Sequence, residues 1–202
     1  MKRLYNSKII ALTLALLAAC LGLHAQSPLF FATENGLSSS LINRVCYTSD
    51  GNLWVATEDG LNRYDGSKIT IYKNVPDDST SIAHNFVNYV FEDTKGHIFV
   101  STHNGLQMYD PARDAFTQRA RGDDGNIYGN PVSAIVERHN GDLWAFGQEI
   151  RQITFDADSN MVIKNLNLPS DLIGANVAIE TPDGCLWCAN DIKGVYRIMP
   201  NN

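Results

Sequence analysis

The stretch DGNLWVATEDGLNRYDG, residues 50–66, decides the fold because it returns three times in altered form. The later copies are KGHIFVSTHNGLQMYD from Lys95, NGDLWAFGQEIRQI from Asn140 and DGCLWCANDIKGVYRI from Asp183. The turn glycines at positions 51, 96, 141 and 184 are 45, 45 and 43 residues apart, a period typical of solenoids, propellers and arrays. The chain is therefore a repeat protein.

Each copy predicts a strand, a tight turn at its glycine and a second strand. Two neighbouring apolar slots recur in the second of these strands. One slot holds Leu53, Ile98, Leu143 and Leu186, and the next holds Trp54, Phe99, Trp144 and Trp187. Neighbouring strand residues point to opposite faces, so both faces of each small sheet are apolar. We expect these sheets to be stacked between one another, with the aromatic series in the core.

The alternating pattern predicts four repeats, at 41–72, 86–118, 132–166 and 176–199, of which the last has only three strands. The apolar residues Leu29–Phe31 predict one more strand, which could complete the last repeat. Repeats of four strands and this length are typical of β-propeller blades. We predict an all-β fold, a β-propeller of four-stranded blades that either closes a small ring or is part of a larger one.

Residues 1–25 predict a signal peptide and hence a periplasmic protein. Lys2, Arg3 and Lys8 precede an apolar run from Ile9 to Leu23, which is shorter than the roughly 20 residues a spanning helix needs. The sequence LAAC ending at Cys20 resembles a lipobox, so a lipoprotein anchored through Cys20 stays an alternative. The expected contact with a membrane is such an anchor or a segment beyond this chain.

The charge excludes one class of partner. The formal charge of −6 becomes −9 without residues 1–25, because that leader holds three basic and no acidic residues. Nucleic-acid binding depends on Lys and Arg neutralising phosphates, so we do not expect a nucleic-acid partner.

The stretch 50–66, preceded by NGLSSSLINRV and followed by DDSTSIAHN, resembles the two-component regulator propeller repeat. The resemblance implies the exported sensor region of hybrid two-component systems, best known in gut Bacteroidota, where large propellers detect breakdown products of polysaccharides. Members of that family usually carry more repeats, a β-sandwich, a membrane span, a histidine kinase, a receiver and a DNA-binding module. We expect this chain to be the N-terminal portion of such a sensor, without the kinase, or a free-standing relative.

Cysteine and histidine residues give little sign of redox or metal chemistry. Cys185 and Cys188 form a C-L-W-C pair, but strand residues three apart face opposite sides, and Cys46 fills an apolar slot. The histidines lie at turns with no ligand spacing, so we expect solvated loop residues, no metal and no cofactor. They are His84, His97, His103 and His139.

Ligand contacts are expected in loops at one end of the blades, because the loop between strands two and three and the link to the next blade emerge there. The candidate binding residues in these hairpin loops are Glu58, Asp59, His103, Asn104, Gln148, Glu149, Asn190 and Asp191. The links add Ser39, His84, Asn85, Asn130 and Asn176. No catalytic residues are predicted.

The leading hypothesis is an exported propeller that binds an oligosaccharide or another small ligand and has no catalysis of its own. One alternative is a glycan-active enzyme, although no distinctive pair of carboxylates is visible. The other is a protein-interaction propeller, which binds the remaining sensor domains or a second copy of itself.

Overall fold

The computed structural model describes residues 29–166, 168 and 174–199, so the predicted signal peptide and Cys20 lie outside the described residues. The chain divides into two compact units, residues 1–31 and 32–202. In the first unit, the described residues 29–31 form no strand, unlike the prediction for Leu29–Phe31. A strand requires a neighbour that pairs with its backbone, and no strand pairing includes these three residues. Within the described ranges, no helix has the length and apolar character needed to cross a membrane.

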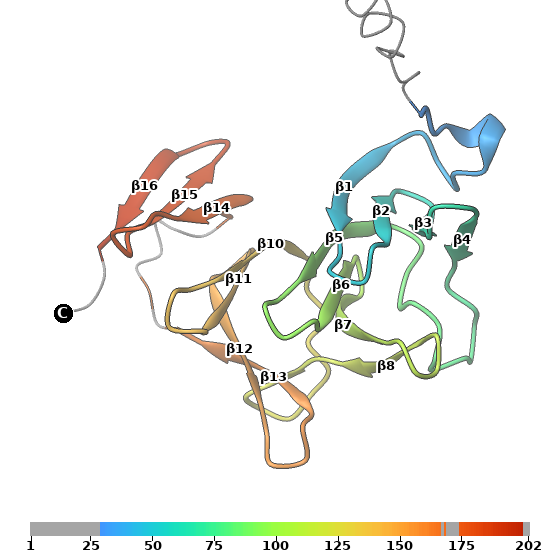
Figure 1. Cartoon of the computed structure of the whole chain (residues 1–202). Helices are drawn as coiled ribbons and strands as arrows, with labels where there is room; N and C mark the ends of the chain where they lie inside the picture. Colours follow the sequence, from blue (N-terminus) through green and yellow to red (C-terminus); the bar gives the residue numbers. More distant parts are fainter. Residues whose placement is uncertain (1–28, 167, 169–173, 200–202) are drawn as a thin grey trace, which may run out of the picture. The chain divides into compact units, whose positions relative to one another are not determined.

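The second unit holds four antiparallel sheets in chain order, which we call blades 1 to 4 (Figure 1). A short 3₁₀ helix, Thr33–Asn35, precedes them. Blade 1 consists of β1 (Ile42–Tyr47), β2 (Leu53–Thr57), β3 (Gly60–Tyr64) and β4 (Ile69–Tyr72). Blade 2 consists of β5 (Val87–Glu92), β6 (Ile98–Thr102), β7 (Gly105–Asp110) and β8 (Ala115–Arg119).

Blade 3 departs from this pattern by one strand. Its four antiparallel strands are β10 (Val132–Glu137), β11 (Leu143–Gly147), β12 (Arg151–Phe155) and β13 (Met161–Asn165). A fifth strand, β9 (Arg121–Gly122), comes from the link after blade 2 and pairs in parallel with β13. The link therefore fastens the outer edge of blade 3, which the sequence pattern did not predict because two residues show no periodicity.

Blade 4 has three strands, in the order β14 (Val177–Glu180), β15 (Leu186–Asn190) and β16 (Gly194–Ile198). The hairpin turns before the second strand of each blade are closed as predicted. Their glycines Gly51, Gly96, Gly141 and Gly184 have φ values of 86°, 84°, 85° and 78°, a left-handed region that glycine enters at no steric cost.

The core lies between blades. One buried cluster contains Trp54 of blade 1 together with Val90 and Phe116 of blade 2. A second cluster joins Phe99 of blade 2 to blade 3 and to Leu186 of blade 4. The first strands of the blades, β1, β5, β10 and β14, contact one another in series. Sheets that bury both faces against their neighbours around inner strands are propeller blades, which confirms the predicted fold class.

A glutamate joins each of blades 2, 3 and 4 to the blade before it. Glu92 accepts hydrogen bonds from the backbone N–H and the hydroxyl of Ser49, both 2.7 Å long. One repeat later, Glu137 accepts the same pair from Thr94, at 2.7 and 2.6 Å. Glu180 then accepts a bond from the backbone N–H of His139 at 2.6 Å. We call this the inter-blade Glu contact, and it fixes the register of three successive interfaces.

A second polar cluster holds blades 1 and 2 together. The Asp114 carboxylate accepts bonds from the hydroxyls of Tyr72 and Tyr109, at 2.5 and 2.6 Å, and pairs with Arg63 at 3.0 Å. Burial and the bonds to Asp114 raise the pKa of both tyrosines. Burial alone would raise the pKa of Asp114, but the bonds from the tyrosines and Arg63 lower it below its ordinary value. The carboxylate therefore stays charged and the tyrosines stay protonated, which suits a structural tie.

Candidate functional site

The hairpin between the second and third strands of a blade lies beside the links between blades. In blade 1 the N–H of Gly60 donates to the carbonyl of Asn85 at 2.7 Å, and in blade 2 that of His103 donates to Phe86 at 3.1 Å. In blade 3 the carbonyl of Gly147 accepts from Gly174 at 2.9 Å. These bonds place hairpin loops and links at a common end in each blade, so ligand contacts there can come from both.

Several candidate residues of this end are already used by the fold. Asp59 forms an ion pair with Lys73 at 2.6 Å, and Glu149 forms one with Arg151. The Asn190 side chain accepts the N–H groups of the two residues 192 and 193 and thereby closes its own turn. Glu58, Gln148 and Asp191 are exposed. These six residues are thus either engaged in contacts within the chain or exposed.

Two histidines of this end form an aromatic stack. The His103 ring lies 3.9 Å from the ring of Phe86 and 5.4 Å from that of His84, centre to centre. The other two pair with carboxylates, His97 with Asp93 and His139 with Glu180, both at 2.8 Å. His103 and His139 are exposed, as expected for loop residues, and each of the four rings in addition has a specific neighbour. Among the described residues no group of three potential ligands could hold a metal ion.

The cysteines keep to the predicted structural role. Cys46, Cys185 and Cys188 are free thiols, and the last two are buried. Burial raises the pKa of the Cys188 thiol, which disfavours the reactive thiolate.

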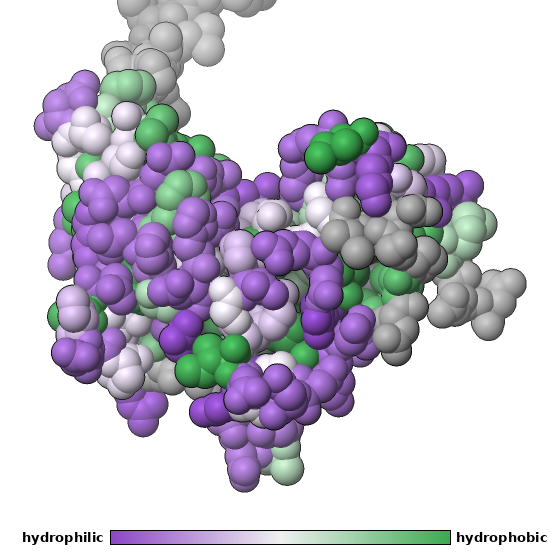
Figure 2. All heavy atoms as spheres, turned by 180° about the vertical axis from the view of Figure 1, so that it is seen from behind, coloured by the Kyte–Doolittle hydropathy of each residue, from purple (hydrophilic) through white to green (hydrophobic). Residues whose placement is uncertain are grey.

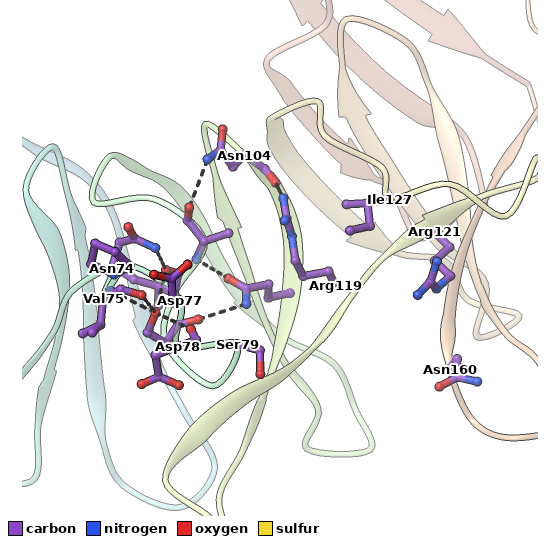
Figure 3. Close-up of a pocket in the computed structure, with 15 residues that line it drawn as sticks. Asn74, Val75, Asp77, Asp78, Ser79, Asn104, Arg119, Arg121, Ile127 and Asn160 are labelled. Carbon is purple, nitrogen blue, oxygen red and sulfur yellow. Dashed lines mark hydrogen bonds between the residues drawn. The ribbon is translucent and has the colours of Figure 1, made fainter.

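The best candidate site is a cavity of about 680 Å³ beside the link between blades 1 and 2 (Figure 3). Its size lies in the range of roughly 300–1,000 Å³ that small-ligand pockets occupy. Of the candidate residues from the sequence, only Asn104 lines it. Its walls also include Asn74, Val75, Asp77, Arg119, Arg121, Ile127 and Asn160.

The first wall is the link at residues 74–83, which is braced from within. The Ser81 hydroxyl accepts the N–H of Val75 at 3.0 Å, and the Asp78 carboxylate accepts both the N–H and the hydroxyl of Thr80. Ile82 anchors the link because its side chain is fully buried. This wall is rigid before any ligand arrives, which lowers the entropic cost of binding.

The floor is formed by Gln107, whose side chain is 1% exposed. Its amide oxygen accepts the N–H of Ala83 at 2.6 Å, and its amide nitrogen donates to the carbonyls of Ser81 and Phe116 at 3.2 and 3.3 Å. The Asn104 amide nitrogen donates to the Ala83 carbonyl at 3.1 Å. Blade 2 thus holds the link in place, and Gln107 has no donor left for a ligand.

The second wall comes from β8, from the link at 121–127 and from the turn before β13. Arg119 donates to the carbonyl of Asn104 at 2.5 Å, and Arg121 donates to that of Gly125 at 2.9 Å. Figure 3 shows Arg121, Ile127 and Asn160 across the view from the link that carries Val75. Ile127 and Val75 are 49% and 51% exposed and present apolar surface.

Both arginines and the link at 74–83 lie outside the hairpin loops in which the candidate residues were expected. Arg119 ends a strand, and Arg121 belongs to the two-residue β9. One signal was available, the alternation RAR at 119–121, which places two cations on one side of an extended segment.

Comparisons with known proteins support the resemblance seen in the sequence. Residues 36–59 match the family described as two component regulator propeller. A 53-residue stretch is 47% identical to histidine kinase P4 of Formosa agariphila, which covers 26% of this chain and 4% of that protein. These two matched stretches are thus similar to repeats of two-component regulators.

Solved structures agree in fold. The chain resembles the extracellular domain of a protein assigned as a hybrid two component system from B. thetaiotaomicron, with a TM-score of 0.70 and 25% identity over 85% of this chain. A second extracellular domain from that organism, assigned to a one component system, gives a TM-score of 0.65 and 22% identity over 86% of this chain. The chain spans 25% and 23% of those two domains.

Proposed function

We propose that this two-component regulator propeller is the ligand-binding part of an exported sensor and that it binds an oligosaccharide released from a polysaccharide. The observation that carries the proposal is the cavity beside the link at 74–83. Its walls offer amide and carboxylate acceptors, guanidinium donors and the exposed apolar surfaces of Val75 and Ile127. A pyranose ring needs both kinds of surface, hydrogen-bonding groups for its hydroxyls and an apolar contact for its C–H face.

We infer further that the chain binds its ligand without converting it. Support comes from the likeness to an extracellular domain assigned to a hybrid two component system. The polar groups on the cavity walls are held by the fold in turns and braces, as a rigid binding surface requires. Ligand binding would then be transmitted by parts of the sensor other than this unit.

Calorimetry with the purified protein tests this proposal. A panel of oligosaccharides prepared from plant and algal polysaccharides is titrated, and we expect at least one to bind in the micromolar range. Ser79→Trp places a large side chain on the cavity wall and should abolish that binding. Binding of no member of the panel, or binding that Ser79→Trp leaves unchanged, would contradict the proposal.

A control variant separates blockage from damage to the fold. Ser67→Trp introduces the same side chain at another exposed serine, in the turn between β3 and β4 and outside the cavity. It should leave the oligosaccharide affinity unchanged. Both variants should unfold within a few degrees of the unmodified protein.

Export is the second part of the proposal. Its support is the basic and apolar pattern of residues 1–25 and the likeness to extracellular domains. Fractionation of cells that express the chain should find it outside the cytoplasm, and deletion of residues 1–25 should retain it inside. Replacing Cys20 by Ala then distinguishes the two processing routes, since only a lipoprotein loses its membrane anchor.

A further inference from the structure

Arg119 and Arg121 present two positive charges to one cavity. Alternate residues of an extended segment point to the same side, and Ala120 between them is fully buried on the other side. Both arginines line the cavity and both are exposed (Figure 3). Figure 3 shows them on separate parts of this wall, so each brings its own positive charge to the cavity, which favours a negative partner.

Within the part of the chain that the structure describes, neither Arg119 nor Arg121 forms an ion pair, although Asp77 and Asp78 line the same cavity. Each guanidinium donates to a single backbone carbonyl. Each of the other described arginines has a partner. Arg44 lies over a tyrosine ring. Five more pair with a carboxylate, namely Arg63, Arg113, Arg138, Arg151 and Arg197. In an acidic chain, two unpaired arginines at one cavity favour an anionic ligand.

The facing wall complements this charge with acceptors. Asp77 lies on the link with a left-handed φ of 66°, which a short polar residue tolerates. The amide nitrogen of Asn74 donates to the carbonyl of Ile82 at 2.7 Å, which leaves its amide oxygen as an acceptor. A carboxylate and an amide oxygen accept hydroxyl protons, whereas they repel a second anion. The ligand should therefore be negative at one end and rich in hydroxyls at the other.

We propose that this cavity binds an anionic saccharide, with its carboxylate or sulfate on Arg119 and Arg121 and its hydroxyls on Asn74 and Asp77. The inference rests on the proposed function and narrows its ligand class. Guanidinium groups bind carboxylates and sulfates through paired, charge-assisted hydrogen bonds. The exposed side chains of Val75 and Ile127 supply the apolar contact for the ring between the two polar ends.

Calorimetry with matched pairs of probes tests the charge requirement. Tetragalacturonate is compared with its fully methyl-esterified form, and a sulfated galactan tetrasaccharide with its desulfated form. We expect at least one charged probe to bind about ten-fold tighter than its neutral partner. The pair in which the charged probe binds more tightly shows whether the anion is a carboxylate or a sulfate. The difference in affinity between the charged and the neutral probe should shrink as the salt concentration rises.

Variants locate the charge. Arg119→Gln and Arg121→Gln keep side-chain length and polarity, and together they should reduce the charged probe to the affinity of its neutral partner. Arg113→Gln is the matched control, because Arg113 is also exposed but lies outside the cavity. If the loss of the bond from Arg119 to Asn104 lowers the melting temperature of the double variant, the single variant Arg121→Gln tests the same loss of affinity for the charged probe.

Two outcomes separate this inference from the function it rests on. If neutral and charged probes bind equally, or if the double variant keeps the preference for charge, the anionic ligand is ruled out and oligosaccharide binding stands. If neither these probes nor the oligosaccharide panel bind, the proposed function fails and this inference fails with it.

Discussion

Trp54 of blade 1 and Trp187 of blade 4 occupy the same slot of the repeat but differ in burial. Each lies opposite an arginine on the next strand, Arg63 or Arg197, whose guanidinium carbon is 5.6 Å from the ring centre in both cases. Trp54 is nevertheless 0% exposed and Trp187 39% exposed. The difference comes from the neighbouring blade, since Tyr109 of blade 2 packs on Trp54 with ring centres 4.9 Å apart.

The third strands of the two blades show the same contrast, since Leu61 is 0% exposed and Val195, in the same slot of blade 4, is 67% exposed. The first strands do not differ in this way, because Val45 of blade 1 is 53% exposed and Val177 of blade 4 is 58% exposed. In Figure 2, apolar side chains gather over blade 4 on the right of the view. The repeat pattern therefore specifies which side chains are apolar, whereas burial also depends on what packs against the blade.

The largest expected effect comes from truncating the two tryptophans. Trp54→Ala should lower the free energy of unfolding by about 3–5 kcal/mol, because it empties a closed, aromatic-lined space. Trp187→Ala should cost about 1–2 kcal/mol, because its ring already contacts solvent. Urea titrations of both variants measure the difference.

Leucine substitutions at the same positions serve as controls, because leucine keeps an apolar side chain of smaller volume there. Equal losses for the two alanine variants would mean that a neighbour also buries Trp187 in solution. A loss near zero for Trp54→Ala would overturn its role in the core.

The inter-blade Glu contact offers a second comparison within the molecule. It joins blade 1 to blade 2, blade 2 to blade 3, and blade 3 to blade 4. The first blade lacks the glutamate of this contact, and the last blade lacks the N–H donor. Tyr47 stands one repeat before Glu92, and Pro182, which has no N–H, stands one repeat after His139. The contact is thus built for three interfaces of this chain.

Glu180 is the member of this series with an altered pKa. Burial alone would raise its pKa, but bonds from the Arg138 guanidinium and the His139 N–H, with the charges of both residues, lower it below the ordinary 4.5. A carboxyl with a lowered pKa in the folded state stabilises the fold above its unfolded pKa, and this stability is lost as the pH falls through the folded pKa. Acid should therefore loosen the interface of blades 3 and 4.

Glu180→Gln should lower the free energy of unfolding by about 2 kcal/mol at pH 7, since a 6% exposed side chain loses its charge-assisted bonds. Melting temperatures between pH 7 and pH 3 check the mechanism. The unmodified protein should lose more stability than the variant below about pH 4.5, so the two curves converge in acid. Parallel curves would assign the pH dependence to other carboxylates.

Much of the fold could be predicted from the sequence because the repeat is defined by patterns among residues that are close together in the chain. The glycines at the hairpin turns and the alternation around Trp54 predict four-stranded blades, and the sheets of blades 1 and 2 have four strands each. The strand expected at Leu29–Phe31 failed because an apolar triplet says nothing about whether a neighbouring strand is available to pair with it. Pairing is a tertiary property, as is the parallel pairing of β9.

The candidate site was less predictable. Asn104 was among the candidates because it lies in a hairpin loop, but the cavity that it lines is completed by residues from three other segments that no local pattern links. Loop position also failed to distinguish free side chains from those used by the fold, such as Asp59 in its ion pair with Lys73. The Glu contact, by contrast, was visible in principle, since Glu92, Glu137 and Glu180 recur at the period of the turn glycines.

The smallest expected effect tests whether the Glu contact requires a donor opposite it. Tyr47→Glu places a glutamate in the contact's slot on blade 1, where the native side chain is 73% exposed. Among the described residues no turn of a preceding blade donates to this position, so the free energy of unfolding should change by less than about 0.5 kcal/mol. The same urea titrations used for Glu180→Gln measure it. A clear gain in stability would reveal a donor next to blade 1, and the asymmetry between inner and outer positions of the series would then disappear.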